Sequence, residues 1–187
     1  MPKVHQIASR TRLPPLEGGL ASPLPKEIQR KAVPEDRNRY QTVYAQQTGA
    51  VVAPTAGLHF TPHLLKRLEL KGSQIVSITL HIGLGTLRPV DVEDLTKYKV
   101  DSEFLSVSAA SAQLVNQALN KNKRVCAVGV STAKAVEDSV AVAGGMKPNY
   151  GWTNKFIFPP YSFKVCTSLT RETRILLGFR VYCRMRF

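Results

Sequence analysis

The chain has 187 residues, 43% of them hydrophobic, and a formal net charge of +13. This length suits one domain with a sizeable core, no apolar run approaches the roughly 20 residues that span a bilayer, and the N-terminus lacks the apolar stretch of a signal peptide. Three widely spaced cysteines form no CxxC pair, so we expect a reducing, cytoplasmic setting without disulfides and without structural zinc.

The charge is compatible with an RNA partner, although most of the excess lies near the two ends of the chain. Residues 1–35 contain six prolines and little periodicity, which predicts an extended, Pro-rich and basic arm. From Asp36 the pattern becomes globular. We therefore place an α/β domain over 36–166 and an atypical Arg-rich segment over 167–187.

The globular part alternates helical and strand patterns. Thr61 and Pro62 predict a helix start, as N-cap and first helical residue, and Gly72 predicts its end. Alternating or β-branched runs predict the later strands, and apolar residues at helical spacing predict the helices. The predicted elements are a helix over 61–72, strands over 74–82 and 102–108, a helix over 108–120, a strand over 124–130 covered on both faces, a helix over 132–143, and a strand over 155–158.

This order indicates an α/β fold with sequential crossovers, in which ligand sites usually follow strands. Four loop segments carry unusual residues: 36–44, 53–61, 81–89 and 129–137. Each also has an ordinary structural interpretation, as a solvated charged face, a histidine bonded to the backbone, a glycine turn that is weak as a phosphate cradle, or a helix cap. Trp152 and Phe156 are expected to pack rather than to form a base-stacking platform.

Six blocks in fixed order carry a family resemblance: RYQTVYA (39–45), APTAGLHFT (53–61), TLHIGLGTLRPV (79–90), DSEF (101–104), RVCAVG (124–129) and GWTNKFIFPPYSFKVC (151–166). Together they resemble the S-adenosylmethionine:tRNA ribosyltransferase-isomerase family of queuosine biosynthesis, over about residues 20–166. The resemblance implies a mixed, barrel-like sheet with helical crossovers, as a partial version of the family's large domain whose inserted β-barrel domain is absent.

The implied reaction transfers the ribosyl part of S-adenosylmethionine to 7-aminomethyl-7-deazaguanine in the tRNA wobble position. The ribose rearranges to give epoxyqueuosine, and adenine and methionine are released. The resemblance implies that the reaction requires no metal. A base must remove a proton beside the sulfonium, and histidine can do so near pH 7. The resemblance therefore places His59 and His81 in the pocket, one of them as the base.

Further roles follow from the same resemblance. Glu103 completes the expected catalytic set, as a contact of the ribose hydroxyls or of the incoming amine. Arg88 is expected to hold the methionine carboxylate or a tRNA phosphate, and Gly57, Gly83 and Gly85 to permit close backbone approach or positive φ. The remaining expected contacts of S-adenosylmethionine are Thr55, Thr86, Ser131 and Thr132. The expected tRNA contacts are Arg37, Arg39, Tyr40 and Lys155.

Three departures from the family pattern stand out. The first part of the family pattern has no counterpart in this chain. The resemblance stops after Cys166, where an Arg-rich segment typical of a changed reading frame follows. Lys134 stands where the family has arginine, which weakens the prediction for 129–137. These departures predict a truncated member. The alternatives are a basic RNA-binding fragment without catalysis and a decayed gene product.

Overall fold

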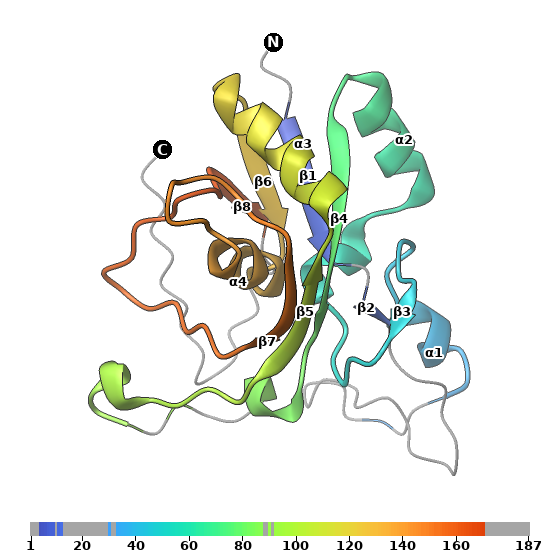
Figure 1. Ribbon diagram of the computed structural model, residues 1–187. Helices are drawn as coiled ribbons and strands as arrows, with labels where there is room; N and C mark the ends of the chain where they lie inside the picture. Colours follow the sequence, from blue (N-terminus) through green and yellow to red (C-terminus); the bar gives the residue numbers. More distant parts are fainter. Residues whose placement is uncertain are drawn as a thin grey trace.

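The structure is a computed structural model that describes residues 4–9, 11–12, 30, 33–87, 90 and 92–170 (Figure 1). Its strands are β1 (Val4–Ser9), β2 (Thr11–Arg12), β3 (Gln47–Thr48), β4 (Gln74–His81), β5 (Glu103–Val107), β6 (Arg124–Val128), β7 (Asn149–Thr153) and β8 (Ser168–Thr170). Its helices are α1 (Asp36–Arg39), α2 (Pro62–Leu70), α3 (Ala109–Asn120) and α4 (Val130–Asp138), with 3₁₀ turns η1 (Thr55–His59), η2 (Leu84–Leu87) and η3 (Leu95–Lys97). None of the helices in these ranges is both long and apolar enough to cross a membrane.

Six strands form one mixed sheet in the order β7-β5-β4-β1-β6-β8. Strands β4, β1, β6 and β8 run parallel to one another, whereas β5 runs antiparallel to both β4 and β7. A second, two-stranded sheet pairs β2 with β3. The α/β class is thus confirmed. Over the described residues the large sheet is open, with β7 and β8 at its edges, so barrel-like closure stays an expectation.

Strand β1 contradicts the extended arm expected over 1–35, because its residues lie inside the sheet. Its residue His5 pairs with Gln74 of β4 on one side and with Val125 of β6 on the other. Both partners are distant in sequence, so the local pattern of 4–9 held no signal for this pairing. Residues 13–29 of the predicted arm, and 171–187 of the predicted C-terminal segment, lie outside the described residues.

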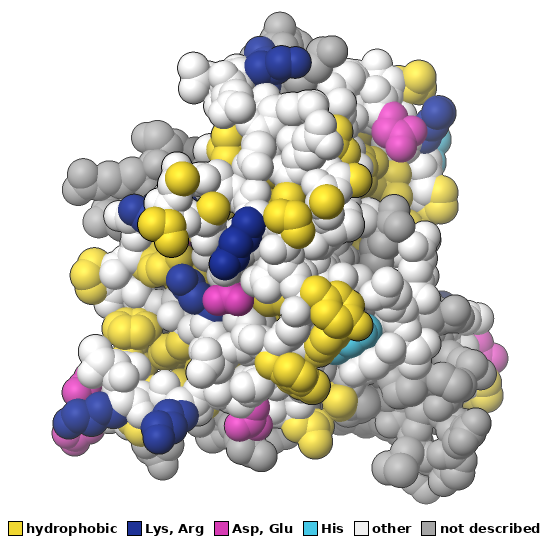
Figure 2. Space-filling model, in the orientation of Figure 1, with side chains coloured by type: hydrophobic (Ala, Val, Ile, Leu, Met, Phe, Trp, Pro, Cys, Tyr) yellow, Lys and Arg dark blue, Asp and Glu magenta, His cyan; other side chains and the backbone are white. Residues whose placement is uncertain are grey.

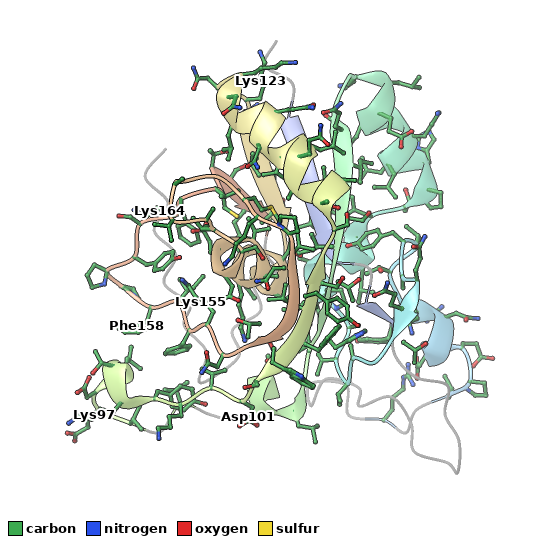
Figure 3. All side chains as sticks on the ribbon, in the orientation of Figure 1. Lys97, Asp101, Lys123, Lys155, Phe158 and Lys164 are labelled. Carbon is green, nitrogen blue, oxygen red and sulfur yellow. The ribbon has the colours of Figure 1, made fainter. Side chains whose placement is uncertain are left out.

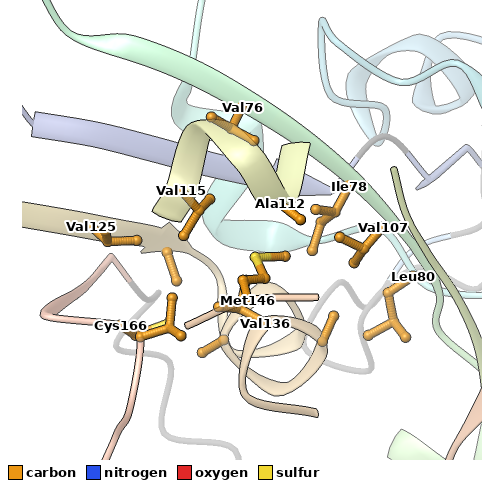
Figure 4. Close-up of a cluster of buried hydrophobic side chains, with 14 of the residues drawn as sticks. Val76, Ile78, Leu80, Val107, Ala112, Val115, Val125, Val136, Met146 and Cys166 are labelled. Atoms are coloured by element: carbon orange, nitrogen blue, oxygen red, sulfur yellow. The ribbon is translucent and has the colours of Figure 1, made fainter. Parts of the chain in front are cut away.

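The main core lies between one face of the sheet and helices α3 and α4 (Figure 1). Figure 4 shows side chains from β4, α3, β6 and α4 converging on this core, with Met146 and Cys166 among them. Leu80, Val115, Val125 and Val136 are fully buried. Full burial of such a side chain stabilises the fold by about 1.5–3 kcal/mol, so this layer supplies a large part of the driving force for folding.

Helix α2 covers the opposite face of the sheet. Its residues Leu64, Leu65 and Leu68 pack with Phe60 and with Val128 of β6. Strand β6 is therefore covered on both faces, as its continuous apolar pattern predicts. The outer strands β5 and β7 differ, because Tyr150 and Trp152 of β7 are 80% and 73% exposed. Trp152 contacts Phe104 but stays mostly exposed, whereas Phe156 packs against Tyr98 and Phe158.

Local signals set most element ends. Thr61 caps α2 by accepting a hydrogen bond from the Leu64 amide at 3.1 Å, and Ser108 caps α3 by accepting from the Ser111 amide at 3.1 Å. The helix predicted over 132–143 instead runs from Val130 to Asp138. It ends there because the chain turns back through two glycines with positive φ at 144 and 145 and Val140 bridges to Met146.

The last predicted strand is misplaced. Residues 155–158 form no strand, and β7 lies at Asn149–Thr153, where it pairs with β5. The apolar run 155–158 was a weak signal, because pairing with β5 rather than local composition selects the strand.

A buried carboxylate holds the irregular segment 161–166 against α4. Glu137 is 2% exposed. Its oxygens accept hydrogen bonds from the amides of Lys164, Val165 and Cys166 at 2.9–3.0 Å and from the hydroxyl of Tyr161 at 3.2 Å. Backbone donors in a segment without helix or strand need such partners, so Glu137 supplies what a neighbouring strand would otherwise provide.

Candidate functional site

The predicted loops meet at the carboxyl end of the parallel strands. Strand β4 ends at His81, and β6 ends at Val128 and leads through Gly129 into α4. Turn η1 reaches the same end, since the Cβ of Ala56 lies 3.9 Å from the position that a Cβ on Gly129 would take. Backbone segment 49–51 runs beside the end of β4, where the Val51 amide donates to the Ile82 carbonyl at 2.8 Å. Three of the four loop segments therefore converge here.

His81 is a half-buried histidine at the last position of β4. Its ring stacks on Phe104 of β5, with centroids 5.8 Å apart and planes at 20°. On another side it abuts Gly49, where a Cβ would lie 2.8 Å from the ring. Burial lowers the pKa of His81 from 6.5, which leaves the imidazole neutral near pH 7 and able to accept a proton.

Glu103, the first residue of β5, is 4% exposed and faces the core side of the sheet. One carboxylate oxygen accepts hydrogen bonds from the Gly83 amide at 3.1 Å and from the Thr86 hydroxyl at 2.7 Å. The other forms an ion pair with Lys134 of α4 at 2.8 Å. A buried carboxylate keeps its charge when it is paired in this way. Glu103 therefore ties η2, β5 and α4 together.

The sheet separates His81 from Glu103. His81 pairs directly with Phe104, and successive residues of a strand point to opposite faces, so Glu103 lies on the face opposite to His81. His81 and Glu103 thus share one end of the sheet but not one surface. Lys134, which sequence reasoning mentioned only as a departure from the family, is the residue that Glu103 contacts.

Two of the three predicted glycines make close contacts. A Cβ on Gly85 would lie 2.6 Å from the Asp101 carboxylate, and Figure 3 shows Asp101 beside η2. A Cβ on Gly57 would collide with the Tyr44 hydroxyl and the Thr42 methyl group. Gly83 has open space instead. None of the three has positive φ, so close approach explains Gly57 and Gly85, and the alternative of positive φ is wrong.

Two buried hydroxyls lie beside Gly57. Within the described part of the chain, Thr42 Oγ1 and Tyr44 Oη are buried without a hydrogen-bond partner. Burial raises the pKa of Tyr44 to about 12, so its hydroxyl stays protonated. Sequence reasoning missed both residues, although both lie in the block RYQTVYA that carried the resemblance. Both hydroxyl-bearing side chains contact η1 at Gly57.

The other expected contacts of S-adenosylmethionine differ in their exposure and in whether they are already hydrogen-bonded within the protein. Thr55 and His59 lie on η1, half-buried and exposed respectively, and Ser131 is half-buried at the start of α4. Thr86 is bound to Glu103, and Thr132 is fully buried and donates to the Val128 carbonyl at 2.7 Å. That bond is typical of a hydroxyl inside a helix. Arg88 lies outside the described residues.

The expected tRNA contacts do not form one surface. Asp36 fixes α1, because its carboxylate accepts two hydrogen bonds from Arg30 at 2.7 Å, and these hold its pKa down at about 2. Arg39 is exposed, and Tyr40 packs with Ala50, Ala53 and Leu58.

Lys155 lies elsewhere. Its Nζ lies 5.5 Å from the centroid of the Tyr161 ring, on the far side of β7 from α1 (Figure 3). The side chain of Arg37 is outside the described residues. The expected tRNA contacts whose side chains are described thus lie at two separate positions, α1 and the segment after β7.

Comparison with known proteins gives a consistent set of matches. A family model described as "Queuosine biosynthesis protein" matches residues 14–172. A protein of Amoebophilus asiaticus named S-adenosylmethionine:tRNA ribosyltransferase-isomerase is 63% identical over 147 residues, which cover 79% of this chain and 42% of the relative. A protein of Flavobacterium psychrophilum with the same name is 48% identical over 167 residues, covering 87% of this chain and 48% of the relative.

Among solved structures, the S-adenosylmethionine tRNA ribosyltransferase of Thermotoga maritima is similar, at 28% identity and a TM-score of 0.45, over 61% of this chain and 34% of that chain. The chain spans about half the length of the curated relatives that it matches.

Proposed function

The chain belongs to the family of queuosine biosynthesis proteins, and from this we propose that it acts in the transfer and isomerisation of the ribosyl part of S-adenosylmethionine onto tRNA. The proposed acceptor is 7-aminomethyl-7-deazaguanine in the wobble position, with adenine and methionine as the leaving products. The observation that carries the proposal is the family match over residues 14–172. The convergence of η1, the end of β4 and the start of α4 supports it.

His81 is the proposed base. The reaction needs a group that removes a proton from the carbon beside the sulfonium, and the burial that lowers the pKa of His81 keeps its imidazole in the accepting form near pH 7. Its ring is held between Gly49 and Phe104, which limits its orientations. His59 lies exposed on η1 and is proposed as the second histidine of the pocket.

Glu103 is proposed as a positioning residue. Its two oxygens are engaged by Gly83, Thr86 and Lys134, so the carboxylate fixes the turn that follows His81. A buried and fully bonded carboxylate of this kind makes a rigid support for a neighbouring group. A direct contact of Glu103 with the ribose or the incoming amine, as the resemblance implies, requires one of these bonds to be exchanged for a ligand bond.

The test is adenine release from S-adenosylmethionine in the presence of tRNA that carries the precursor base. His81→Gln is expected to abolish turnover while the protein stays folded, and His59→Gln to reduce it. His63→Gln is the matched control, because His63 is exposed on α2, away from the converging loops. Wild-type turnover in both His59→Gln and His81→Gln would overturn the assignment of the histidines.

The pH dependence gives a second measurement on the same assay. A base with a pKa below 6.5 is deprotonated at pH 7, so the rate is expected to be flat above about pH 7 and to fall as the pH drops through the lowered pKa. The A. asiaticus relative serves as positive control. RNA binding that weakens steeply with salt, without adenine release under any condition, would instead indicate a non-catalytic RNA-binding protein.

A further inference from the structure

The outer face of strands β4, β5 and β7 carries two rows of side chains, of which only His81 has a proposed catalytic role. Strand register places His81, Phe104 and Trp152 directly opposite one another, and we call these three the aromatic row. The next row along the same face is Thr79, Ser106 and Tyr150. Because alternate residues of a strand share a face, both rows lie on the side of the sheet opposite to the main core.

The aromatic rings in these rows are arranged as a platform. Phe104 meets Tyr150 edge-to-face at 4.9 Å and 85°, and meets Trp152 at 5.8 Å and 76°. Phe104 thus supports two rings that are 80% and 73% exposed. Figure 2 shows large hydrophobic side chains beside a histidine on this face, over β5 and β7. Edge-to-face contacts fix the orientation of exposed rings, so their flat surfaces are available for stacking.

A polar cavity adjoins the platform. It has a volume of about 320 Å³, and Thr79 and Ser106 of the second row are among its lining residues. Further polar groups of the lining come from Ser77, Ser108 and Gln46, and apolar side chains of β4 and α3 also line it. Hydroxyl and amide side chains can donate and accept hydrogen bonds. The aromatic platform on the outer face therefore lies next to a cavity with neutral polar groups, which extends from β4 and β5 to helix α3.

We propose that this face binds an unpaired RNA nucleotide, with its base stacked on Trp152 and Tyr150 and its ribose hydroxyls in the polar cavity. Exposed aromatics on a sheet are a common platform for unpaired bases, and the 2′-hydroxyl of RNA suits a cavity lined by donors and acceptors. The chain also has 26 Lys and Arg against 13 Asp and Glu, most of the excess near its two ends, which is compatible with a polyanionic partner. The proposal rests on the proposed function in that tRNA would supply the nucleotide.

The geometry links this surface to His81. A base on the platform would lie on the row that ends at His81, the proposed base of the reaction. The stacked nucleotide would then be the target itself or one of its neighbours in the loop. Stacking would hold the RNA loop beside the end of β4 without any contact from Arg39 or Lys155.

Trp152 is the single tryptophan of the chain, so its fluorescence reports on the platform directly. The full chain is titrated with a short RNA stem–loop and, separately, with a blunt RNA duplex of equal length, both without S-adenosylmethionine. We expect quenching by the stem–loop and little by the duplex. By anisotropy of labelled stem–loop RNA, Trp152→Ala is expected to bind about tenfold more weakly, and Trp152→Phe to retain most of the affinity.

A control variant distinguishes stacking on Trp152 from a general effect of removing an exposed apolar side chain. Leu70→Ala removes an equally exposed side chain, 77% exposed on α2, and is expected to leave binding unchanged. Tyr150→Ala provides a second variant if Trp152→Ala fails to fold. Equal quenching by duplex and stem–loop would overturn the proposal, as would unchanged binding by both Ala variants or concentration-dependent dimerisation that buries Trp152. Because binding is measured without the cofactor, absence of adenine release tests the proposed function alone.

Discussion

Strand β5 has two contrasting faces. On one face Glu103, Leu105 and Val107 are buried against α3 and α4. On the other, Phe104 is half-buried and supports Tyr150 and Trp152, which are exposed. Neighbouring residues of one five-residue strand therefore face a dry core and an open surface.

The difference shows which strands of the sheet mainly stabilise the fold and which can also bind a ligand. Strand β6, in the covered part of the sheet, packs on both faces with α2, α3 and α4, and its side chains determine stability. Among the described residues, helices cover only one face of the strand pair β5–β7, so its second face can contact a ligand at little cost to folding. Substitutions on the two sides of β5 should separate stability from binding.

The largest expected effect comes from Lys134→Ala. Removing the lysine leaves Glu103 buried without its cation at 2.8 Å, and loss of one partner of a buried pair destabilises by about 3–5 kcal/mol. Urea unfolding followed by circular dichroism measures the change. Lys66→Ala is the control, because its pair with Glu69 is exposed and should contribute less than about 1 kcal/mol. Equal effects of the two variants would contradict the described role of Glu103.

Leu80→Ala tests the covered face of β4. Leu80 is 0% exposed within the core, and truncation of such a residue to alanine costs about 2–5 kcal/mol, partly through the cavity left behind. The change is read from the urea midpoint at constant slope. Leu84→Ala is the matched control, since Leu84 is 59% exposed. A loss below about 1 kcal/mol for Leu80→Ala would place this strand outside the cooperative core.

Glu137→Gln tests the anchoring of segment 161–166. The amide keeps one acceptor oxygen but loses the charge, so some of the four hydrogen bonds to this carboxylate weaken or are lost. Hydrogen bonds to a charged group are worth about 1.5–3 kcal/mol each, and we expect a loss of about 2 kcal/mol in unfolding free energy. Asp138→Asn, at the half-buried neighbouring position, should remain within about 0.5 kcal/mol.

The smallest expected effect on stability is that of Trp152→Ala. Because the side chain is 73% exposed, its loss should change unfolding free energy by no more than about 0.5 kcal/mol, measured in the same urea assay. A loss above about 2 kcal/mol would mean that the outer face of β5 and β7 is as structural as the inner face. The contrast between the two faces would then be wrong.

Much of the fold follows from local signals in the sequence. The cap at Thr61, the apolar spacing over 108–120 and the apolar run of β6 each act over a few residues, and the two helices and the strand that they predict are confirmed. Strand β1 and strand β7 were missed because their identity depends on partners far along the chain. Edge position and pairing with β5 select Asn149–Thr153, whereas composition alone favoured the apolar run that follows it.

The site was predictable to a similar degree. Residues in family blocks pointed to one end of the sheet, where three of the four predicted loops meet, but not to which face each side chain occupies. The separation of His81 from Glu103 depends on the register of β4 and β5, which no local pattern encodes. The pair Glu103–Lys134 joins β5 to α4. Such a pair can be predicted only when the arrangement of β5 and α4 in the fold is known.

The grip of Glu137 on segment 161–166 has a consequence for the motions of the chain. Backbone amides in irregular segments usually exchange with solvent quickly, because local opening exposes them. The amides of Lys164, Val165 and Cys166 donate to the carboxylate of Glu137, a buried residue of α4. They should therefore exchange with deuterium only when α4 detaches, at the slow rate of a core helix. A segment that looks like a loop in Figure 1 would then behave in time as part of the core.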